Sequence, residues 1–314
     1  MSVRERLLAV TIVSTLLGAH LWIFMGWHLA PPTLRLAAVS PVAIVIVVKI
    51  QMVLPMIFLL ELLQLGTPGV RRPAKYLSYE FWLDIAYNFQ SAILYLTIFG
   101  GVIVASALVL TDLTPLLFPR LAQLPGPIQI FLAVWLYDFV VYWRHRTFHW
   151  AGCLWPFHAV HHVGKQVDMF TTYRLHIVEL MIGGILNRWV GGIIGLSDAA
   201  LYQGFALYIY YNYFIHSNIA GRFPGALKYV LISPFMHRWH HAIEPSARDR
   251  NFGVVFAWHD WLFGTALHPD HEPAAYGIEQ DPQIKMSESW LSQQLYPFRK
   301  LINVFLRRKD APDP

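Results

Sequence analysis

The sequence is poor in charged residues and has almost no cysteine. Asp, Glu, Lys and Arg make up 14% of its 314 residues, against roughly a quarter in soluble domains. Its one cysteine, Cys153, excludes an intramolecular disulfide and any four-cysteine zinc or iron–sulfur site. Dense basic runs with interleaved aromatic residues are also absent, so the pI of about 9.3 does not indicate a nucleic-acid partner. The excess Lys and Arg lie beside apolar segments, where membrane topology and anionic lipid account for them.

Apolar residues dominate instead, at 56% of the chain, with a mean hydropathy of +0.42. A helix needs about 20 apolar residues to cross a bilayer. Four segments meet this length, namely residues 7–30, 36–65, 81–110 and 127–143. We therefore predict an all-α integral membrane protein with about four transmembrane helices. Residues 175–217 are also apolar but carry Asn187 and Arg188 in the middle, which favours either two short spans or an interfacial or re-entrant helical pair.

Basic residues predict the orientation of these helices. In the four-span arrangement, one side carries Arg4, Arg6, Arg71, Arg72, Lys75, Arg144 and Arg146, and the other carries Arg35 and Arg120. The more basic side is expected to be cytoplasmic, and the bacterial inner membrane is the expected location. We divide the chain into an N-terminal transmembrane region (1–126), a catalytic domain with a cytoplasmic histidine-rich helical cap (127–270) and a cytoplasmic, solvated C-terminal tail (271–314).

Histidines form the clearest motif of the sequence. Fifteen are present, and ten lie between His145 and His241. Three groups stand out: His145 and His149 at a spacing of four, and two copies of His-x-x-His-His. The copies comprise His158, His161 and His162, and His237, His240 and His241. Spacings of three and four place side chains on one helical face, and Asn212 and His216 have the same spacing. A lone histidine is more often structural, but two chance copies of this motif are improbable, so the groups predict metal binding.

The count of histidines narrows the kind of metal site. Imidazole binds zinc, iron, copper and nickel alike. Eight histidines in the three groups, or nine with His216, suffice for two sites of four to five ligands each. Neither the His-Glu-x-x-His motif of zinc proteases nor the Glu-x-x-His pair of carboxylate-bridged di-iron proteins occurs in the sequence. A histidine-only dinuclear centre beside a bilayer favours iron and oxygen chemistry.

The three groups resemble the histidine boxes of the fatty acid hydroxylase and sterol desaturase superfamily, over residues 128–267. Flanking residues agree with this: Asp138, Tyr142 and Arg146 at the first box, Trp155 and Pro156 before the second, Ser233 and Pro234 before the third, and Asn251-Phe-Gly and Trp261-Leu-Phe-Gly-Thr after it. The resemblance implies that the eight box histidines are metal ligands and His216 a ninth. Some relatives carry histidine where this chain has Asn212, which suggests a less direct contact there.

Other polar residues near the boxes are candidates for supporting roles. Asp138, Tyr142, His145 and His149 share one helical stripe. Asp138 lies in an apolar span, where a carboxylate is costly and usually functional. We expect it either to orient a ligating imidazole or to hydrogen-bond a neighbouring helix. Arg174 and His176 resemble an Arg-x-His feature of the family. We expect them either to contact the substrate, to contact the metal-binding histidines, or to have a purely structural role. The motif gives no role for His259.

The resemblance implies an oxidoreductase with two iron ions that uses O₂ to attack an unactivated C–H bond of a lipid. Hydroxylation is favoured over desaturation, which uses the same site. Electrons are expected from an external NAD(P)H-linked donor, a separate reductase with a ferredoxin or cytochrome, because the chain contains no such module. A membrane metal transporter and a di-zinc lipid hydrolase are the alternatives from other classes.

Overall fold

A computed structural model describes residues 78–94, 118, 120–219, 221–279, 286 and 289–309. This part of the chain is helical, with two isolated β-bridges, Leu231 to Phe256 and Ala242 to Tyr276, and no strand. The all-α prediction is therefore confirmed for these residues. The predicted spans at 7–30 and 36–65 lie outside the described residues, and the third is described only as far as Leu94.

Helix α6 (Gly126–Trp150) is the longest element of the described structure. It begins with Pro127 in its first turn, where a missing N–H costs no helical hydrogen bond. Among the described residues it alone is long and apolar enough to cross a membrane. The fourth predicted span thus exists as a helix, and it continues seven residues beyond its predicted end to carry His145 and His149.

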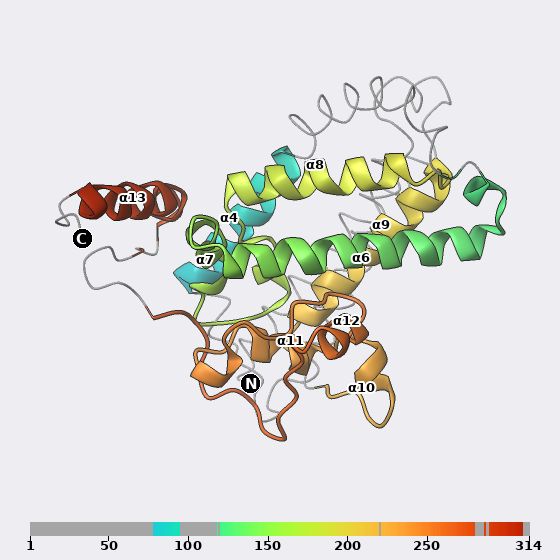
Figure 1. The fold of residues 1–314 in the computed structure, drawn as a ribbon. Helices are drawn as coiled ribbons and strands as arrows, with labels where there is room; N and C mark the ends of the chain where they lie inside the picture. Colours follow the sequence, from blue (N-terminus) through green and yellow to red (C-terminus); the bar gives the residue numbers. More distant parts are fainter. Residues whose placement is uncertain are drawn as a thin grey trace, which may run out of the picture.

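Helices α8 (Ile177–Ile193) and α9 (Asp198–His216) pack along α6 (Figure 1). Each starts at a side-chain cap, His176 for α8 and Ser197 for α9. At the crossing of α6 and α9, a Cβ on Gly204 would lie 2.5 Å from the Cβ of Ala133. Glycine at this position lets the two backbones approach closely. The apolar region 175–217 is thus a helical pair; whether it crosses or lies on a membrane stays a prediction.

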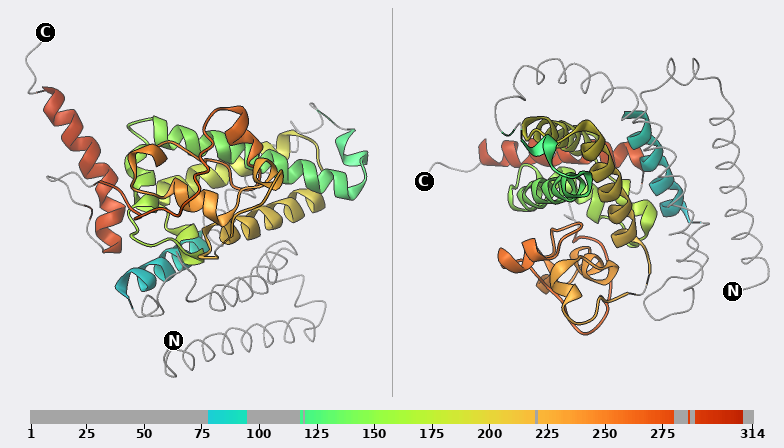
Figure 2. Two further views of the ribbon diagram at one scale, coloured as in Figure 1. Left: turned by 90° about the horizontal axis from the view of Figure 1, so that it is seen from below. Right: turned by 90° about the vertical axis from the view of Figure 1, so that its right-hand side faces the viewer.

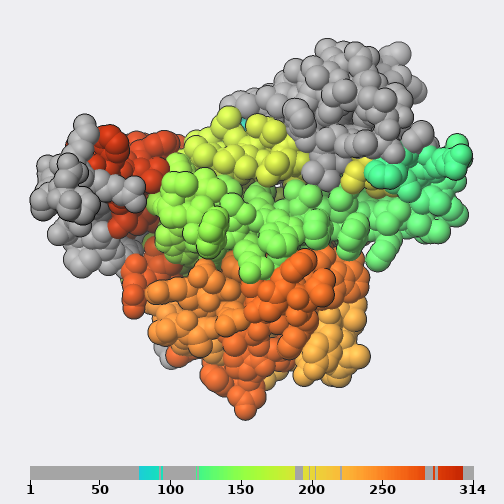
Figure 3. Space-filling model, viewed as in Figure 1, coloured from blue at the N-terminus to red at the C-terminus, as the bar shows by residue number. Residues whose placement is uncertain are grey.

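The cap, which we define as residues 221–279, packs against α6 (Figure 3). It contains three short helices, α10 (Leu227–Val230), α11 (Pro234–His240) and α12 (Trp258–Leu262), and the 3₁₀ turn η6 (Pro245–Ala247). Ser233 caps α11 and is followed by Pro234 in the first turn, a strong start signal. Helix α7 (Trp155–His162) and the 3₁₀ turn η5 (Met169–Tyr173) lie near the C-terminal end of α6. The cap, α6 and α7 therefore meet where the histidines are.

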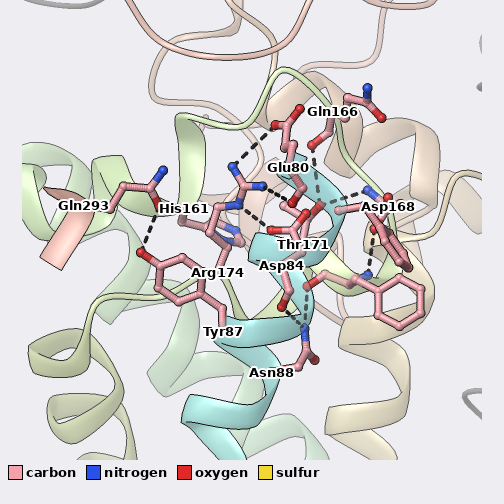
Figure 4. A network of polar contacts seen from close by, with 12 residues as sticks. Glu80, Asp84, Tyr87, Asn88, His161, Gln166, Asp168, Thr171, Arg174 and Gln293 are labelled. Atoms are coloured by element: carbon pink, nitrogen blue, oxygen red, sulfur yellow. Dashed lines mark hydrogen bonds and ion pairs between the residues drawn. The ribbon is translucent and has the colours of Figure 1, made fainter. Parts of the chain in front are cut away.

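Helices α4 (Tyr79–Leu94) and α13 (Trp290–Lys309) and the short 3₁₀ turn η4 (Leu121–Gln123) are the remaining elements of the described structure. Buried Arg174 joins η5 to α4 through ion pairs with Asp84 and Glu80 (Figure 4). The Tyr87 hydroxyl of α4 donates to the Gln293 side chain of α13 over 2.9 Å. These contacts attach both outer helices to the end of the molecule that holds α7.

Candidate metal centre

Four helices bring together the nine histidines singled out in the sequence. They form two groups, and within each group one nitrogen atom from every histidine lies within 4.8 Å of those of the other members. The five-histidine group comprises His145 and His149 of α6, His158 and His162 of α7, and His240 of α11. The four-histidine group comprises His161 of α7, His216 of α9, His237 of α11 and His241 directly after it. Each His-x-x-His-His motif therefore supplies both groups, as expected where two metals are held side by side.

Within each group the Nε2 atoms converge. In the five-histidine group the distances are 3.0 Å from His145 to His158, 3.1 Å from His158 to His162 and 3.2 Å from His149 to His162. In the four-histidine group they are 3.2 Å from His161 to His216, 2.9 Å from His216 to His237 and 3.2 Å from His237 to His241. Both groups thus present a small, inward-facing set of imidazole nitrogens.

Backbone carbonyls fix the orientation of three of these rings. His145 Nδ1 lies 3.0 Å from the carbonyl oxygen of Phe252, and His240 Nδ1 lies 2.7 Å from that of Arg250. His216 Nδ1 lies 2.8 Å from the carbonyl oxygen of Asn212. A carbonyl only accepts, so Nδ1 carries the proton in each ring and Nε2 keeps its lone pair.

Two carboxylates orient further rings of the five-histidine group through Nδ1. Glu179 Oε1 of α8 lies 2.9 Å from His158 Nδ1, and both side chains are buried. Asp249 Oδ1 of the cap lies 3.3 Å from His149 Nδ1, and the Asp249 side chain is 57% exposed. A carboxylate on the outer nitrogen increases the basicity of the inner one. The five-histidine group therefore receives more negative charge than its neighbour from the contacts described.

The donor set fits metal ions. His145 and His158 both donate from Nδ1, so their Nε2 lone pairs face each other across 3.0 Å without a proton between them. A cation between the two atoms removes this repulsion. Burial lowers the pKa of His240 to about 4, and it lowers the pKa well below 6.5 for His158, His161, His162, His237 and His241. Neutral imidazole is the form that binds metal.

Asp138 holds the cap onto α6. Its carboxylate accepts hydrogen bonds from the backbone N–H groups of Val254, Val255 and Phe256 at 2.8–3.0 Å, and it is fully buried. It also lies 3.2 Å from His259 Nδ1. Asp138 thus holds a cap loop; among the described residues it hydrogen-bonds neither a cluster imidazole nor a neighbouring membrane span, the two partners expected from the sequence. The contact with Asp138 also gives a structural position to His259, for which the motif indicated no role.

Tyr142 belongs to a second series of polar contacts between α6 and the cap. Its hydroxyl lies 2.8 Å from Thr265 Oγ1, which donates to Asp260 Oδ1 over 2.7 Å. Asp260 also accepts from the N–H groups of Phe252 and Gly253 at 2.8 Å. Burial raises the pKa of Asp260 to about 6. Because the carbonyl of Phe252 accepts from His145, this series of hydrogen bonds is connected to the cluster through the backbone of Phe252.

The remaining candidates have structural contacts. Asn212 reaches His216 through its main-chain carbonyl. Arg174 is buried in the ion pairs with α4 (Figure 4). His176 caps α8 through Nδ1, and its Nε2 lies 2.9 Å from the carbonyl oxygen of Gln294 in α13. For Arg174 and His176, these contacts match the structural alternative weighed in the sequence.

A pocket of about 330 Å³ leads from the outside to the five-histidine group. His149, His162 and His240 form its inner wall, and Glu244, Arg248 and Glu279 lie among its polar lining residues. Asp249, the partner of His149, also lines it. Among the described residues, this pocket gives the cluster an opening with charged walls.

Sequence reasoning missed Glu179, Asp249 and Asp260. Glu179 had a detectable signal, because it is an acidic residue at the start of an apolar helix, soon after the second box. Asp249 and Asp260 carry no such signal. Asp249 lies in a left-handed turn (φ 58°), and its contact with His149 spans 100 residues of sequence.

Comparisons with known proteins agree with the histidine pattern. Residues 130–265 match the family described as Fatty acid hydroxylase. The chain is 30% identical over 160 residues to alkylglycerol monooxygenase of Danio rerio, covering 51% of this chain and 34% of that protein. The human protein of that name is 30% identical over 142 residues, covering 45% and 31%. Ornithine lipid hydroxylase OlsE of Rhizobium tropici is 26% identical over 178 residues, covering 57% and 53%.

The matches therefore span about a third of the alkylglycerol monooxygenases and about half of the ornithine lipid hydroxylase. No solved structure matches the chain.

Proposed function

Residues 130–265 are a domain of the fatty acid hydroxylase and sterol desaturase superfamily, and from this premise we propose that the chain is an O₂-dependent di-iron lipid hydroxylase. The observation that carries the proposal is the pair of inward-facing histidine groups, five and four imidazoles side by side. Relatives named as lipid monooxygenases and hydroxylases support the reaction class.

The two groups would hold one iron ion each. Bound iron would supply the activation of O₂ and the removal of a hydrogen atom from a C–H bond. The overall reaction takes a C–H bond, O₂, two electrons and two protons to an alcohol and water. The chain's own part is to keep the nine imidazoles neutral by burial and to surround them with protein rather than water. It also orients five of the rings through contacts at Nδ1, those of His145, His149, His158, His216 and His240.

The relatives and the membrane setting support a proposal for the substrate class. We propose an amphiphilic membrane lipid with an unactivated C–H bond. The charged pocket beside His149 and His240 suits a polar part of such a lipid, with Arg248 for an anionic group and Glu244 or Glu279 for a cationic one. Helix α6 is long and apolar enough to cross the bilayer from which the lipid comes. The basic residues counted in the sequence favour a cytoplasmic site.

Electrons are proposed to come from a separate NAD(P)H-linked reductase with a ferredoxin or cytochrome. A single cysteine leaves no ligands for an iron–sulfur cluster within this chain. A desaturase would use the same histidines and differ in its product, an alkene in place of an alcohol. A metal transporter or a di-zinc hydrolase would need neither O₂ nor electrons.

Metal analysis of detergent-purified protein tests the proposal first. Protein expressed with added iron is expected to hold about two irons per chain, coupled and nitrogen-rich in Mössbauer spectra. O₂ consumption with a reductase and a lipid screen then identifies the substrate, and mass spectrometry separates alcohol from alkene. Two zinc ions that iron cannot replace would support the hydrolase, and metal flux without O₂ consumption would support the transporter.

Substitution of one histidine from each group links the metal to the activity. His161→Ala in the four-histidine group and His240→Ala in the five-histidine group are each expected to abolish turnover and lower the iron content. Membrane insertion should be unchanged, because both residues lie outside α6. Full activity in either variant would contradict the site assignment.

A further inference from the structure

Helix α13 (Trp290–Lys309) combines an apolar surface with an entirely basic charge pattern. Its 20 residues contain no Asp or Glu. They contain five basic residues, Arg299, Lys300, Arg307, Arg308 and Lys309. The helix follows the histidine-box domain, and neither the metal centre nor the pocket uses it.

The side of α13 that faces the protein carries two polar side chains. Gln293 and Gln294 are buried there beside Tyr296, which packs with Tyr87 in an apolar cluster. The Gln293 side chain accepts from the Tyr87 hydroxyl over 2.9 Å, and the Gln294 side-chain oxygen accepts from the N–H of Ile177 over 3.2 Å. The main-chain carbonyl of Gln294 lies 2.9 Å from His176 Nε2. Hydrogen bonds therefore fix the rotation of α13 about its own axis.

The opposite side of α13 is apolar. Leu291, Leu295, Phe298, Ile302 and Leu306 follow one another at spacings of four, three, four and four, which places them on one helical face. We call these five residues the α13 stripe. Their side chains are 38–59% exposed, and Phe298 also contacts the ring of Phe157 at its edge. The stripe therefore forms a continuous exposed ridge along the helix.

This arrangement differs from that in a helix of a soluble protein. An amphipathic helix normally buries its apolar stripe against the core and exposes its polar face. In α13 the two glutamines and Tyr296 face the protein, and the apolar stripe faces outward. A helix with an exposed apolar face, basic residues around it and low net hydrophobicity is typical of one that lies in a membrane interface.

The orientation of α13 agrees with this. It runs across the direction of α6, near the end of the molecule that holds α7 (Figure 2). If α6 crosses a bilayer, a helix placed across it lies along the bilayer plane. On a helical wheel Arg299 borders the α13 stripe, where it reaches anionic headgroups while the stripe enters the acyl boundary.

We propose that α13 is an interfacial anchor, whose stripe binds the surface of a bilayer containing anionic lipid. The anchor fixes the histidine-box domain to the membrane at a second place besides α6. Through the bonds of α13 to His176 and Tyr87, it also connects the lipid surface to α8 and α4. The proposal uses neither metal nor catalysis, so it stands or falls separately from the proposed function.

Site-specific fluorescence in the full chain tests the anchor. Cys153→Ser removes the one native thiol, and a single cysteine then carries an NBD label at Ile302→Cys in the stripe or at Val304→Cys. Val304 is 44% exposed and lies on the other side of the helix, which makes it a matched control two residues away. Both proteins are reconstituted in vesicles of equal parts phosphatidylglycerol and phosphatidylcholine.

The label at position 302 is expected to be quenched several-fold more strongly by lipid-borne nitroxide than the label at 304, and to be shielded from aqueous iodide. Equal quenching at the two positions would overturn the proposal. Shielding of 302 from both quenchers, with disulfide-linked dimers of the unlabelled Ile302→Cys protein, would assign the stripe to a second copy of the chain instead.

The basic residues have their own test. In vesicles of pure phosphatidylcholine, or with Arg299→Gln, the difference between positions 302 and 304 is expected to shrink. An unchanged difference would mean that the stripe enters the bilayer without anionic lipid, which overturns that part of the proposal. Leu291→Gln and Leu295→Gln together should reduce the nitroxide quenching of the label at position 302 and leave iron content unchanged.

Discussion

Glu179 and Asp249 place carboxylates of different exposure against the same group of imidazoles. Glu179 is buried and 2.9 Å from His158, whereas Asp249 is 57% exposed and 3.3 Å from His149. Glu179→Ala is therefore expected to lower the metal affinity of the five-histidine group by roughly 10–100-fold, the usual cost of losing such a partner. Asp249→Ala should lower it less, because water screens this contact.

Metal retained per chain after dialysis against graded chelator measures both effects. Glu179→Gln is the control, because its amide oxygen still accepts from His158. Equal retention by wild-type protein and Glu179→Ala would show that the glutamate does not support the site.

Between elements, Asp138 connects α6 to the cap. Replacing it with alanine leaves three buried N–H groups, those of residues 254–256, without an acceptor. At about 1–3 kcal/mol for each such group, the loss is expected to be on the order of 3 kcal/mol or more. Thermal unfolding in detergent measures it. Asp138→Asn retains one acceptor oxygen and should lose less; a wild-type melting curve for Asp138→Ala would contradict this role.

The crossing of α6 and α9 gives a second prediction between elements. Gly204→Ala places a Cβ 2.5 Å from that of Ala133, which forces the helices apart at a cost of about 1–3 kcal/mol. The same change at Gly152, where nothing lies within 4 Å of a new Cβ, is the control. Thermal unfolding should separate the two variants, and equal melting temperatures would contradict the close packing.

Sequence spacing predicted the parts of this site that lie within one helix. His145 and His149 share a helical face because they are four residues apart, and α6, α8 and α9 follow from apolar runs. The partners of Nδ1 were not predictable in the same way. Phe252 and Arg250 act through main-chain carbonyls, which any residue has, and Asp249 reaches His149 through a tertiary contact. Spacing carries no information about such contacts.

α13 was missed for a different reason. The C-terminal tail was expected to be solvated, and no helix was predicted in it. The apolar residues between its Lys and Arg residues recur at helical spacing, but only the buried glutamines reveal which face turns outward. Burial of a polar face is a property of the assembled structure.

For the molecule as a whole, the buried histidines make stability depend on pH. In the unfolded chain they titrate near the usual value of 6.5, whereas burial lowers the pKa in the folded protein. The unfolded state then binds more protons below that pH, so acid favours unfolding. The metal-free protein is expected to melt at lower temperature as pH falls from about 7.5 to about 5.5. Metal-loaded protein should change less, and a flat metal-free profile would contradict the burial of neutral rings.

Metal removal should loosen the contact between the cap and the helices. The two groups connect α6, α7, α9 and α11, so bound metal stabilises their assembly. Chelation is expected to lower the melting temperature and to expose cap loops to limited proteolysis, with recovery when metal is restored. Unchanged cleavage after chelation would show that the cap is held by protein contacts such as Asp138 alone.

The order of the histidines along the chain also bears on how the protein is made. His145 and His149 leave the ribosome well before α11 is synthesised, and both groups need histidines from α11. The five-histidine group is complete only once His240 has emerged, and the four-histidine group only once His241 has, so complete metal loading follows the synthesis of α11. In the folded protein, the pocket lined by His149, His162 and His240 opens the five-histidine group to the outside. A cell short of the metal would therefore accumulate finished, empty chains rather than half-loaded ones, and could load them later without new translation.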